Sequence, residues 1–376
     1  TLDNPVYLQV GDTQSNLMKQ LGRKLRDNAP RPITLVFITS GSCTNIDVMY
    51  HRSARITANM QYVPSLAEDP TWTPTSATLP CTPPSPDGAG TPGVFPDIGN
   101  SALFNSACTT EAPPATLALT QGPAQAYVMA VPKLSQQTAM TFEEAYFVFG
   151  FGTAGMVTPW MDETQLFIRT VTKSTVLAWA ANISVPAAQW KGTRFDGSSM
   201  VVAALEGAAG AAAETAVGIL GAEVYDARRQ TLTALAFRAS RQYAAYYPDS
   251  TSTSFDKQNV RDGHYTVWSP TIWMDNVDAG GAPTKPDARY VIDLIAGKPV
   301  TPAPNFSASE VVARVGLVPD CAMRVTRTFE GGPLQLSAPP ISCTCKFESV
   351  VASSACETCT TSCAVGVCRD GYCEEK

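Results

Sequence analysis

The apolar run at residues 33–39 is the feature that most restricts how this chain can fold. It lacks the apolar–polar alternation of a strand with one wet face, so it predicts a strand buried on both faces of a parallel sheet. An extended piece at 6–10 and a helix at 15–26, with apolar residues at helical spacing, precede it; a turn of small residues at 40–43 follows. Strand, helix, strand and turn in this order predict the start of a doubly wound α/β lobe.

Length and composition indicate a large folded protein. The 376 residues exceed what one ordinary core supports and suit two lobes with an appendage. Hydrophobic residues make up 44% and charged residues 16%, unlike a disordered chain. The net charge of -6 argues against nonspecific nucleic-acid binding, and no run approaches the roughly 20 apolar residues of a membrane helix. Because the chain begins at Thr1 without Met, we expect a mature, exported form, in which an upstream lipid-attachment cysteine would not be seen.

Cysteines are distributed unevenly along the chain. Three lie early, at Cys43, Cys81 and Cys108, and the other eight follow in the C-terminal tail, at Cys321, Cys343, Cys345, Cys356, Cys359, Cys363, Cys368 and Cys373. The tail is rich in Ser, Thr, Gly and Ala and poor in large apolar residues, so we expect disulfides to hold it together. The spacing Cys356-x-x-Cys359 leaves a four-cysteine zinc site as the alternative. Since eleven is odd, at least one thiol is free or pairs with another molecule.

The stretch at 63–93 is rich in Pro, Thr and Ser and predicts a long surface loop. Cys81 and Cys108 are candidates for a disulfide that would join the ends of this loop.

A second α/β segment follows the loop. Its first helix begins at Thr141, with Glu144 three residues on, as in a capping box. Two extended segments, at 125–132 and 232–240, predict a hinge between the lobes. Residues 232–237 are expected to form one return strand, and residues 265–268 another strand. We therefore expect lobe I at 1–128 and 236–320, lobe II at 129–235, and a cysteine-rich extension at 321–376.

Short motifs recur along the chain in a characteristic order. They are Gly11-Asp12-Thr13, Ser40-Gly41-Ser42, Asp97-Ile98-Gly99-Asn100-Ser101, Thr141-Phe142-Glu143-Glu144-Ala145-Tyr146, Leu166-Phe167-Ile168-Arg169, Gln189-Trp190-Lys191-Gly192, Ala216-Val217-Gly218-Ile219-Leu220 and Val260-Arg261-Asp262-Gly263-His264-Tyr265. In order and spacing the chain resembles the phosphate-binding proteins of bacterial phosphate ABC importers, over roughly residues 6–320, in a branch with a cysteine-rich C-terminal extension. The resemblance implies the type II periplasmic binding protein fold, two α/β lobes joined by extended segments.

The resemblance also implies a function, which is trapping phosphate or a related oxyanion between the lobes without catalysis, cofactor or metal. Helix N-termini, hydroxyls and one Arg hold the anion in that family, as their dipoles and donors allow. Carried over to this chain, the ligands are Thr13, Ser42, the Cys43 backbone, Arg169, Ser174 and Thr175. The implied partner is an ABC importer, and the implied location is the periplasm, the outer surface or the extracellular space, where lipid anchoring is common.

Two positions depart from the family pattern. Ala102 stands where the family has an Asp that accepts the proton of hydrogen phosphate, and Lys173 stands in a loop of small residues, where it either pairs with the anion or blocks the pocket. A site made only of donors suits a fully ionised anion at least as well as phosphate. The sequence therefore predicts that Arg169→Ala abolishes anion affinity and that Lys173→Gly changes selectivity.

Two other classes of function compete with anion binding. The departures favour a surface or fibre-forming structural protein that keeps the fold with a degenerate pocket and binds copies of itself. A secreted hydrolase has less support, because no H-E-x-x-H, G-x-S-x-G or Walker motif occurs and the chain has only two histidines. Cys43 in Ser-Gly-Ser-Cys invites a nucleophile interpretation, but a disulfide or a buried thiol is the favoured one in an exported protein.

Overall fold

The structure is a computed structural model that describes residues 2–83, 93–352 and 354–375. The chain divides into two compact units: the first comprises Thr1–Pro123 and Pro270–Val315, and the second comprises Ala124–Ser269 and Gly316–Lys376. It passes from one unit to the other within two strands, β6 (Leu117–Pro132) and β13 (Trp268–Asn276), and again after Val315. None of the helices in the described ranges combines the length and apolar character that a membrane span requires.

Unit 1 is built on a mixed sheet with the strand order β4-β3-β2-β1-β5-β13. The strands before β13 are β1 (Pro5–Gly11), β2 (Thr34–Ser40), β3 (Met60–Tyr62), β4 (Leu79–Cys81) and β5 (Ile98–Ser101). β1 pairs in parallel with both β2 and β5, as expected for a doubly wound lobe. The first four residues of β2 are buried, so the apolar run does form a strand covered on both faces.

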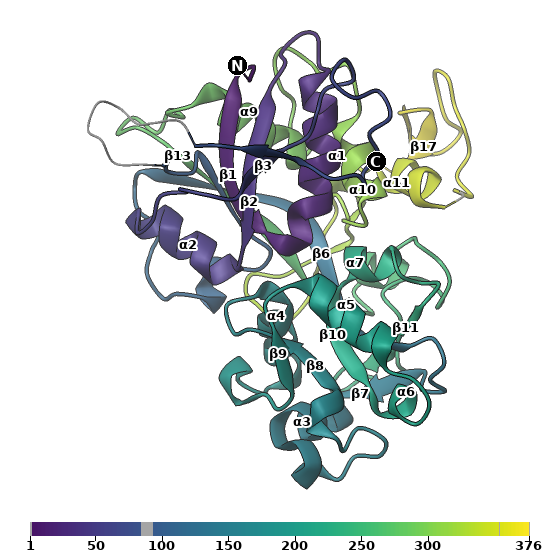
Figure 1. Cartoon of the computed structure of the whole chain (residues 1–376). Helices are drawn as coiled ribbons and strands as arrows, with labels where there is room; N and C mark the ends of the chain where they lie inside the picture. Colours follow the sequence, from purple (N-terminus) through teal and green to yellow (C-terminus); the bar gives the residue numbers. More distant parts are fainter. Residues whose placement is uncertain (1, 84–92, 353, 376) are drawn as a thin grey trace. The chain divides into compact units, whose positions relative to one another are not determined.

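The α-helices that the structure describes in unit 1 are α1 (Ser15–Arg26), α2 (Ser42–His51), α9 (Pro286–Ile295) and α10 (Ala308–Arg314). Leu17, Met18, Leu21 and Leu25 form the buried face of α1, which packs against β2 (Figure 1). The helix α2 begins directly after β2 and packs on β5. Gly41, which links β2 to α2, therefore places the N-terminus of α2 at the carboxyl end of the parallel strands, where such folds commonly bind ligands.

Unit 2 has a second sheet, with the order β6-β10-β8-β9 and β11 on the other side of β6. Its strands are β8 (Leu166–Arg169), β9 (Thr193–Phe195), β10 (Val217–Gly221) and β11 (Leu232–Ala234), and a separate pair is formed by β7 (Ala139–Thr141) and β12 (Ala236–Arg238). β8 is parallel to both β9 and β10, whereas β6 is antiparallel to β10.

The helices of unit 2 before the tail are α3 (Phe142–Phe151), α4 (Ser174–Ile183), α5 (Ser198–Gly207), α6 (Ala212–Thr215), α7 (Ala222–Asp226) and α8 (Gln258–Arg261). The capping box at the start of α3 is present: the Glu144 N–H donates to Thr141 Oγ1 at 3.1 Å, and the Thr141 N–H donates to Glu144 Oε2 at 2.8 Å. In the core, Phe149 stacks on Trp190, and Trp179 meets Phe237 edge-on. The α/β character of both units agrees with the type II periplasmic binding fold.

Two expected strands differ in the structure. The run 232–237 was expected as one return strand, but it divides at Leu235 into β11, which pairs with β6, and β12, which pairs with β7. The strand expected at 265–268 instead begins at Trp268 and continues to Asn276, and Tyr265 directs its hydroxyl to the Tyr127 carbonyl at 2.6 Å. In both cases the pairing partner decides the boundary, and the partner is distant in sequence.

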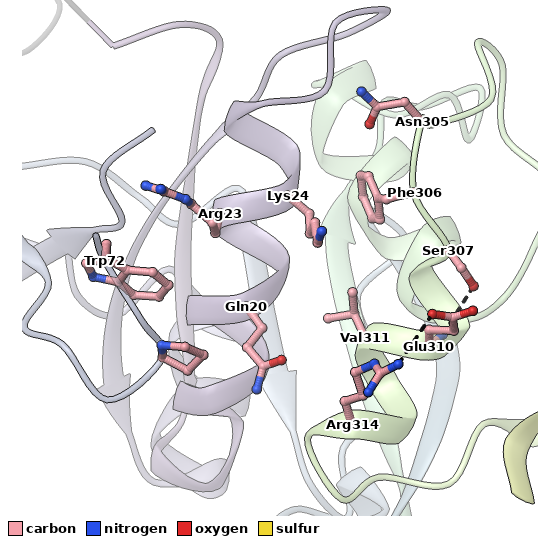
Figure 2. A pocket seen from close by; sticks show the side chains of 11 residues that line it. Gln20, Arg23, Lys24, Trp72, Asn305, Phe306, Ser307, Glu310, Val311 and Arg314 are labelled. Atoms are coloured by element: carbon pink, nitrogen blue, oxygen red, sulfur yellow. Dashed lines mark hydrogen bonds and ion pairs between the residues drawn. The ribbon is translucent and has the colours of Figure 1, made fainter. Parts of the chain in front are cut away.

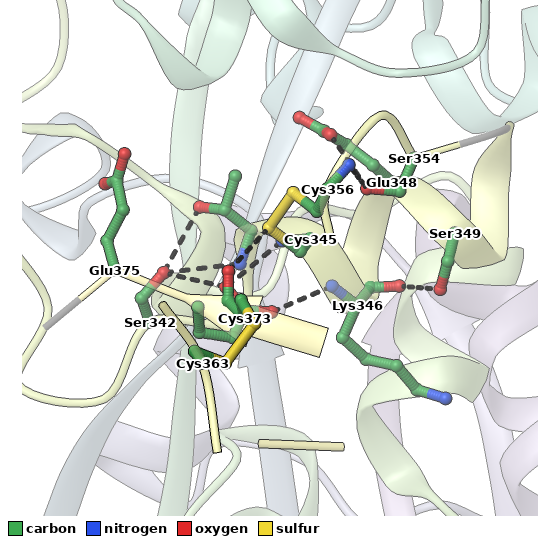
Figure 3. Close-up of a disulfide and its surroundings, with 12 residues drawn as sticks. Ser342, Cys345, Lys346, Glu348, Ser349, Ser354, Cys356, Cys363, Cys373 and Glu375 are labelled. Atoms are coloured by element: carbon green, nitrogen blue, oxygen red, sulfur yellow. Dashed lines mark hydrogen bonds between the residues drawn. A yellow bond between two sulfur atoms is a disulfide. The ribbon is translucent and has the colours of Figure 1, made fainter. Parts of the chain in front are cut away.

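The C-terminal segment belongs to unit 2 and contains α11 (Thr344–Val351) and two short hairpins. The hairpin strands are β14 (Val325–Thr326), β15 (Gln335–Leu336), β16 (Val367–Arg369) and β17 (Tyr372–Glu374). The disulfides of the tail are Cys321–Cys343, Cys345–Cys356, Cys359–Cys368 and Cys363–Cys373. Figure 3 shows two of them side by side, Cys345–Cys356 and Cys363–Cys373. The expected disulfide-held tail is therefore confirmed.

The early cysteines pair differently from what we expected. Cys43 pairs with Cys108, and Cys81 is the free cysteine among the described residues, so Cys81 and Cys108 do not join the ends of the surface loop. The bond joins the first turn of α2 to the segment after β5, two elements that already pack together. Part of the surface loop, 84–92, lies outside the described residues. Sequence spacing carries no information on such proximity.

Candidate functional site

Arg169 is fully enclosed at the end of β8 in unit 2. Its guanidinium donates to the Phe195 carbonyl from Nε at 3.2 Å and to the Asp196 carbonyl from Nη2 at 2.6 Å. Nη1 donates to Ser198 Oγ at 2.5 Å. The planar fork therefore joins the end of β8 to the turn between β9 and α5, which fixes its orientation in the unit.

The helix α4 begins five residues after Arg169 and contributes the next group of candidates. Lys173 occupies its N-cap position, and Ser174 and Thr175 are its first two residues, all three buried. Thr175 Oγ1 is enclosed and makes no hydrogen bond to any described residue. Hydroxyls and unpaired N–H groups at a helix start form a partial positive charge, which favours an anion nearby.

Lys173 has a protein partner. Its ammonium lies 3.1 Å from Asp196 Oδ1, and the same oxygen accepts a hydrogen bond from Thr170 Oγ1 at 3.3 Å. The hydrogen bond from Lys173, together with its charge, Thr170 and the Arg169 charge, lowers the pKa of Asp196 below its ordinary value despite partial burial. Lys173 is therefore ion-paired within the unit.

A second helix N-terminus lies in the same part of unit 2. α5 begins at Ser198, whose hydroxyl accepts from Arg169, and its N-cap is Gly197. The starts of α4 and α5, Arg169 and Lys173 thus gather two helix dipoles and two cations in one place. Asp196 contributes a carboxylate to this group. Such an arrangement offers the positive charge and the hydrogen-bond donors that bind a small oxyanion.

The unit 1 candidates lie at the carboxyl ends of β1 and β2. Thr13 is buried in a single helical turn (Asp12–Gln14) directly after β1, and its hydroxyl accepts from the Gln14 amide at 3.4 Å. Ser42 opens α2, and its Oγ accepts from the Ala102 N–H at 3.2 Å. These contacts hold the loop after β1 and the loop after β2 in a defined conformation within the unit.

The remaining two unit 1 positions have different roles. The Cys43 sulfur is bonded to Cys108, so Cys43 is not a free nucleophile; its backbone N–H lies in the first turn of α2. Ala102 is fully buried, and its N–H donates to Ser42 Oγ. Its neighbour Asn100 supplies polar side-chain atoms, donating weakly to the Ile272 and Ser101 carbonyls.

Sequence reasoning placed Arg169, Ser174 and Thr175 in one segment; in the structure Arg169 ends β8, and Ser174 and Thr175 begin α4. It assigned no ligand role to Ser198 or Asp196, which contact Arg169 and Lys173. The available signal was the Asp196-Gly197-Ser198 turn at the start of a helix. A turn of this composition is common at helix starts, so only the pairing of β8 with β9 shows which cations it meets.

A groove of about 500 Å³ lies elsewhere in unit 1, and it contains none of the predicted ligands. Figure 2 shows its walls: Gln20 and Lys24 come from α1, Val311 and Arg314 from α10. Trp72 and Phe306 add aromatic surface, and the Trp72 indole N–H is bound to the Ala77 carbonyl at 3.0 Å. Arg314 approaches Glu310 only to 3.9 Å. Aromatic and polar side chains both line this groove, and its Arg314–Glu310 ion pair is long. The described lining residues therefore do not form a set of oxyanion donors like that around Arg169.

A possible metal site was tested in the tail. The sulfurs of Cys359, Cys363 and Cys373 lie within 4.8 Å of one another, but each is bonded in a disulfide. Thiolates are the zinc ligands, so these sulfurs do not bind zinc in the oxidised protein. Cys356 is likewise bonded to Cys345. The alternative of a four-cysteine zinc site is therefore not realised in this structure.

Comparison with known proteins identifies the fold of this chain but assigns it to no family. No family model and no curated protein matches the sequence. Among solved structures, the chain is similar to a Clostridium perfringens protein provisionally assigned as a phosphate ABC transporter substrate-binding protein and solved with bound phosphate: TM-score 0.54, 12% identity, 84% of this chain and 99% of that chain covered.

Two other solved structures are more distant. An ABC-type phosphate transport receptor from Vibrio cholerae has a TM-score of 0.48 at 13% identity, covering 83% of this chain and 99% of that one. The reduced OxyR regulatory domain from Pseudomonas aeruginosa has a TM-score of 0.41 at 9% identity, covering 77% and 95%. At 12% identity, the similarity to the Clostridium perfringens structure establishes the type II periplasmic binding fold and leaves the ligand open.

Proposed function

We propose that this chain is an extracytoplasmic solute-binding protein that holds phosphate or a related oxyanion. The observation that carries the proposal is the gathering of Arg169, Lys173 and the starts of α4 and α5 in unit 2. Two cations and two helix N-termini in one place favour an anionic ligand, because unpaired N–H groups and guanidinium donors match oxyanion acceptors. Ser174 and Thr175 are proposed as ligands here.

In unit 1 we propose Thr13, Ser42 and the Cys43 backbone as further ligands. They lie in the loops after parallel strands and at the N-terminus of α2, the positions where α/β sheets commonly bind anions. The disulfides of the chain are consistent with an exported protein, since such bonds persist in oxidising compartments. We propose the cell surface or periplasm as location and an ABC importer as partner.

The test is isothermal titration calorimetry of the full, desalted protein against phosphate, sulfate and arsenate in anion-free buffer. We expect a heat of binding with one-to-one stoichiometry for at least one of the three anions. Arg169→Ala should abolish it, and Arg169→Lys, which keeps the charge without the fork, should weaken affinity by about tenfold or more. Circular dichroism and melting confirm that each variant is folded, because Arg169 also holds the 195–198 turn.

A matched control is Arg238→Ala, which removes an exposed guanidinium of the same unit that pairs with Glu143 at 2.8 Å. It should leave affinity unchanged. If the folded wild-type protein gives no heat with any of the three anions, the proposal is wrong. If the protein binds but folded Arg169→Lys binds equally well, the anion lies elsewhere and the proposed ligands are wrong.

The second candidate is a structural protein that keeps the fold without a ligand and associates with its own copies. It is favoured by the internal contacts of Arg169, whose three nitrogens already donate to Phe195, Asp196 and Ser198. The absence of binding heat for all three anions, together with concentration-dependent assembly in light scattering, would favour a structural role over anion binding.

A further inference from the structure

The Lys173–Asp196 pair unites a buried partner with an exposed one. The Lys173 side chain is 7% exposed, whereas that of Asp196 is 80% exposed. A buried ammonium requires a counter-charge, because its desolvation is otherwise uncompensated. A carboxylate that is largely in water loses little solvation when it moves away. The pair is therefore easy to separate from the Asp196 side, provided that another anion reaches the ammonium.

The backbone around Asp196 is held independently of its carboxylate. The Asp196 carbonyl accepts from Arg169 Nη2 at 2.6 Å, and the neighbouring Phe195 carbonyl accepts from Arg169 Nε. The carboxylate is the part of Asp196 that contacts the Lys173 ammonium and the Thr170 hydroxyl. The side chain can thus rotate out while the turn that positions Ser198 and Arg169 stays in place. Its lowered pKa, caused first by the hydrogen bond from Lys173, keeps the carboxylate ionised near neutral pH.

We propose that Asp196 is a resident counter-ion, which the ligand anion displaces from Lys173. The inference rests on the proposed function and makes it more specific. Without ligand, the carboxylate neutralises the ammonium at the start of α4; when an oxyanion enters, it replaces the carboxylate at that ammonium. Displacing the carboxylate lowers the affinity for every anion. The loss is largest for monoanions, because the single charge of a monoanion replaces that of the carboxylate and leaves none to compensate Arg169.

The test compares calorimetric affinities for sulfate and phosphate in the full-length protein and in Asp196→Asn. Removing the competitor should raise both affinities by about two- to fivefold, the range expected for an ion pair with one exposed partner. Glu143→Gln is the matched control: it removes one carboxylate of unit 2 that is 60% exposed and paired with Arg238. It should leave both affinities unchanged.

A second comparison separates displacement from simple repulsion between Asp196 and the ligand. In a Lys173→Met background no shared cation remains, so Asp196→Asn should give no further gain. A gain that persists there means through-space repulsion alone and overturns the proposal.

The other outcomes are distinct. If the wild-type protein binds and Asp196→Asn binds equally or more weakly, the counter-ion role is wrong while the proposed function stands. If only Asp196→Asn binds, no anion displaces the carboxylate in the wild-type protein, so the inference and the proposed function are both overturned. If neither binds any anion, both the inference and the proposed function are overturned.

Discussion

Lys257 is fully enclosed in unit 2 and lies between two carboxylates. Its ammonium is 2.9 Å from Asp226 Oδ2 and 2.9 Å from Asp249 Oδ1. Arg229 completes the group: Nη2 lies 2.6 Å from the other oxygen of each carboxylate. Two cations and two anions thus balance, and they join the end of α7 to the loop before α8. We expect Lys257→Met to destabilise the protein strongly.

The magnitude follows from the burial. Met replaces the apolar stem of the side chain but leaves two carboxylates with one cation, and breaking a buried ion pair in this way costs about 3–5 kcal/mol. Burial alone would lower the pKa of Lys257, but the two carboxylates outweigh it, so the pKa lies above the ordinary 10.5. A raised pKa of a basic group stabilises the fold fully below the unfolded value, and the effect is lost as pH rises through the folded value. At pH 7 the whole contribution is therefore present.

The assay is urea unfolding at pH 7 with disulfides intact, followed by circular dichroism and tryptophan fluorescence. Lys191→Met, an exposed lysine of the same unit, is the control and should change the unfolding free energy by no more than about 0.5 kcal/mol. Adding Asp249→Asn to Lys257→Met should restore part of the loss, because the remaining charges balance again. A Lys257→Met protein as stable as the Lys191→Met control would refute the reasoning.

Two further predictions concern unit 1. Replacing both Cys43 and Cys108 by Ser opens a bond that spans 65 residues, so the chain-entropy model predicts a loss of about 4 kcal/mol in urea unfolding; an unchanged midpoint and slope would contradict it. The hydrogen bonds that the His51 ring donates to the Glu111 and Asp47 carboxylates raise the pKa of His51 above 6.5, so its stabilising effect is present below pH 6.5 and is lost as pH rises through the folded pKa. An NMR titration should show the raised pKa and its decrease in Glu111→Gln, and an identical titration in both proteins would be inconsistent with this contact.

Elements with a local signal could be predicted from the sequence. The helix α1 carries its apolar residues at helical spacing, and β8 is a short apolar run that ends at Arg169. The capping box of α3 needs only Thr141 and Glu144, three residues apart. Periodicity and capping depend on neighbours in the chain, so the chemistry that forms them is visible in the sequence.

Pairings between distant segments could not be predicted in this way. The run 232–237 is uniformly suited to one strand, yet β6 and β7 each take a part of it. Likewise, Cys81 lies closer in sequence to Cys108 than Cys43 does, but the packing of α2 on β5 brings Cys43 to Cys108. Strand and thiol partners are selected by proximity in the folded unit, which local composition does not encode.

The sequence by itself determined the α/β class, the disulfide-held tail and the segment that carries Arg169, Ser174 and Thr175, because each depends on residue type and short spacing. Only the tertiary structure decided what surrounds these residues. The pairing of β8 with β9 brings Asp196 and Ser198 to Arg169 and Lys173, although they are more than twenty residues away in the chain. Charges interact through space with a strength set by distance and burial, and both quantities exist only once the chain has folded.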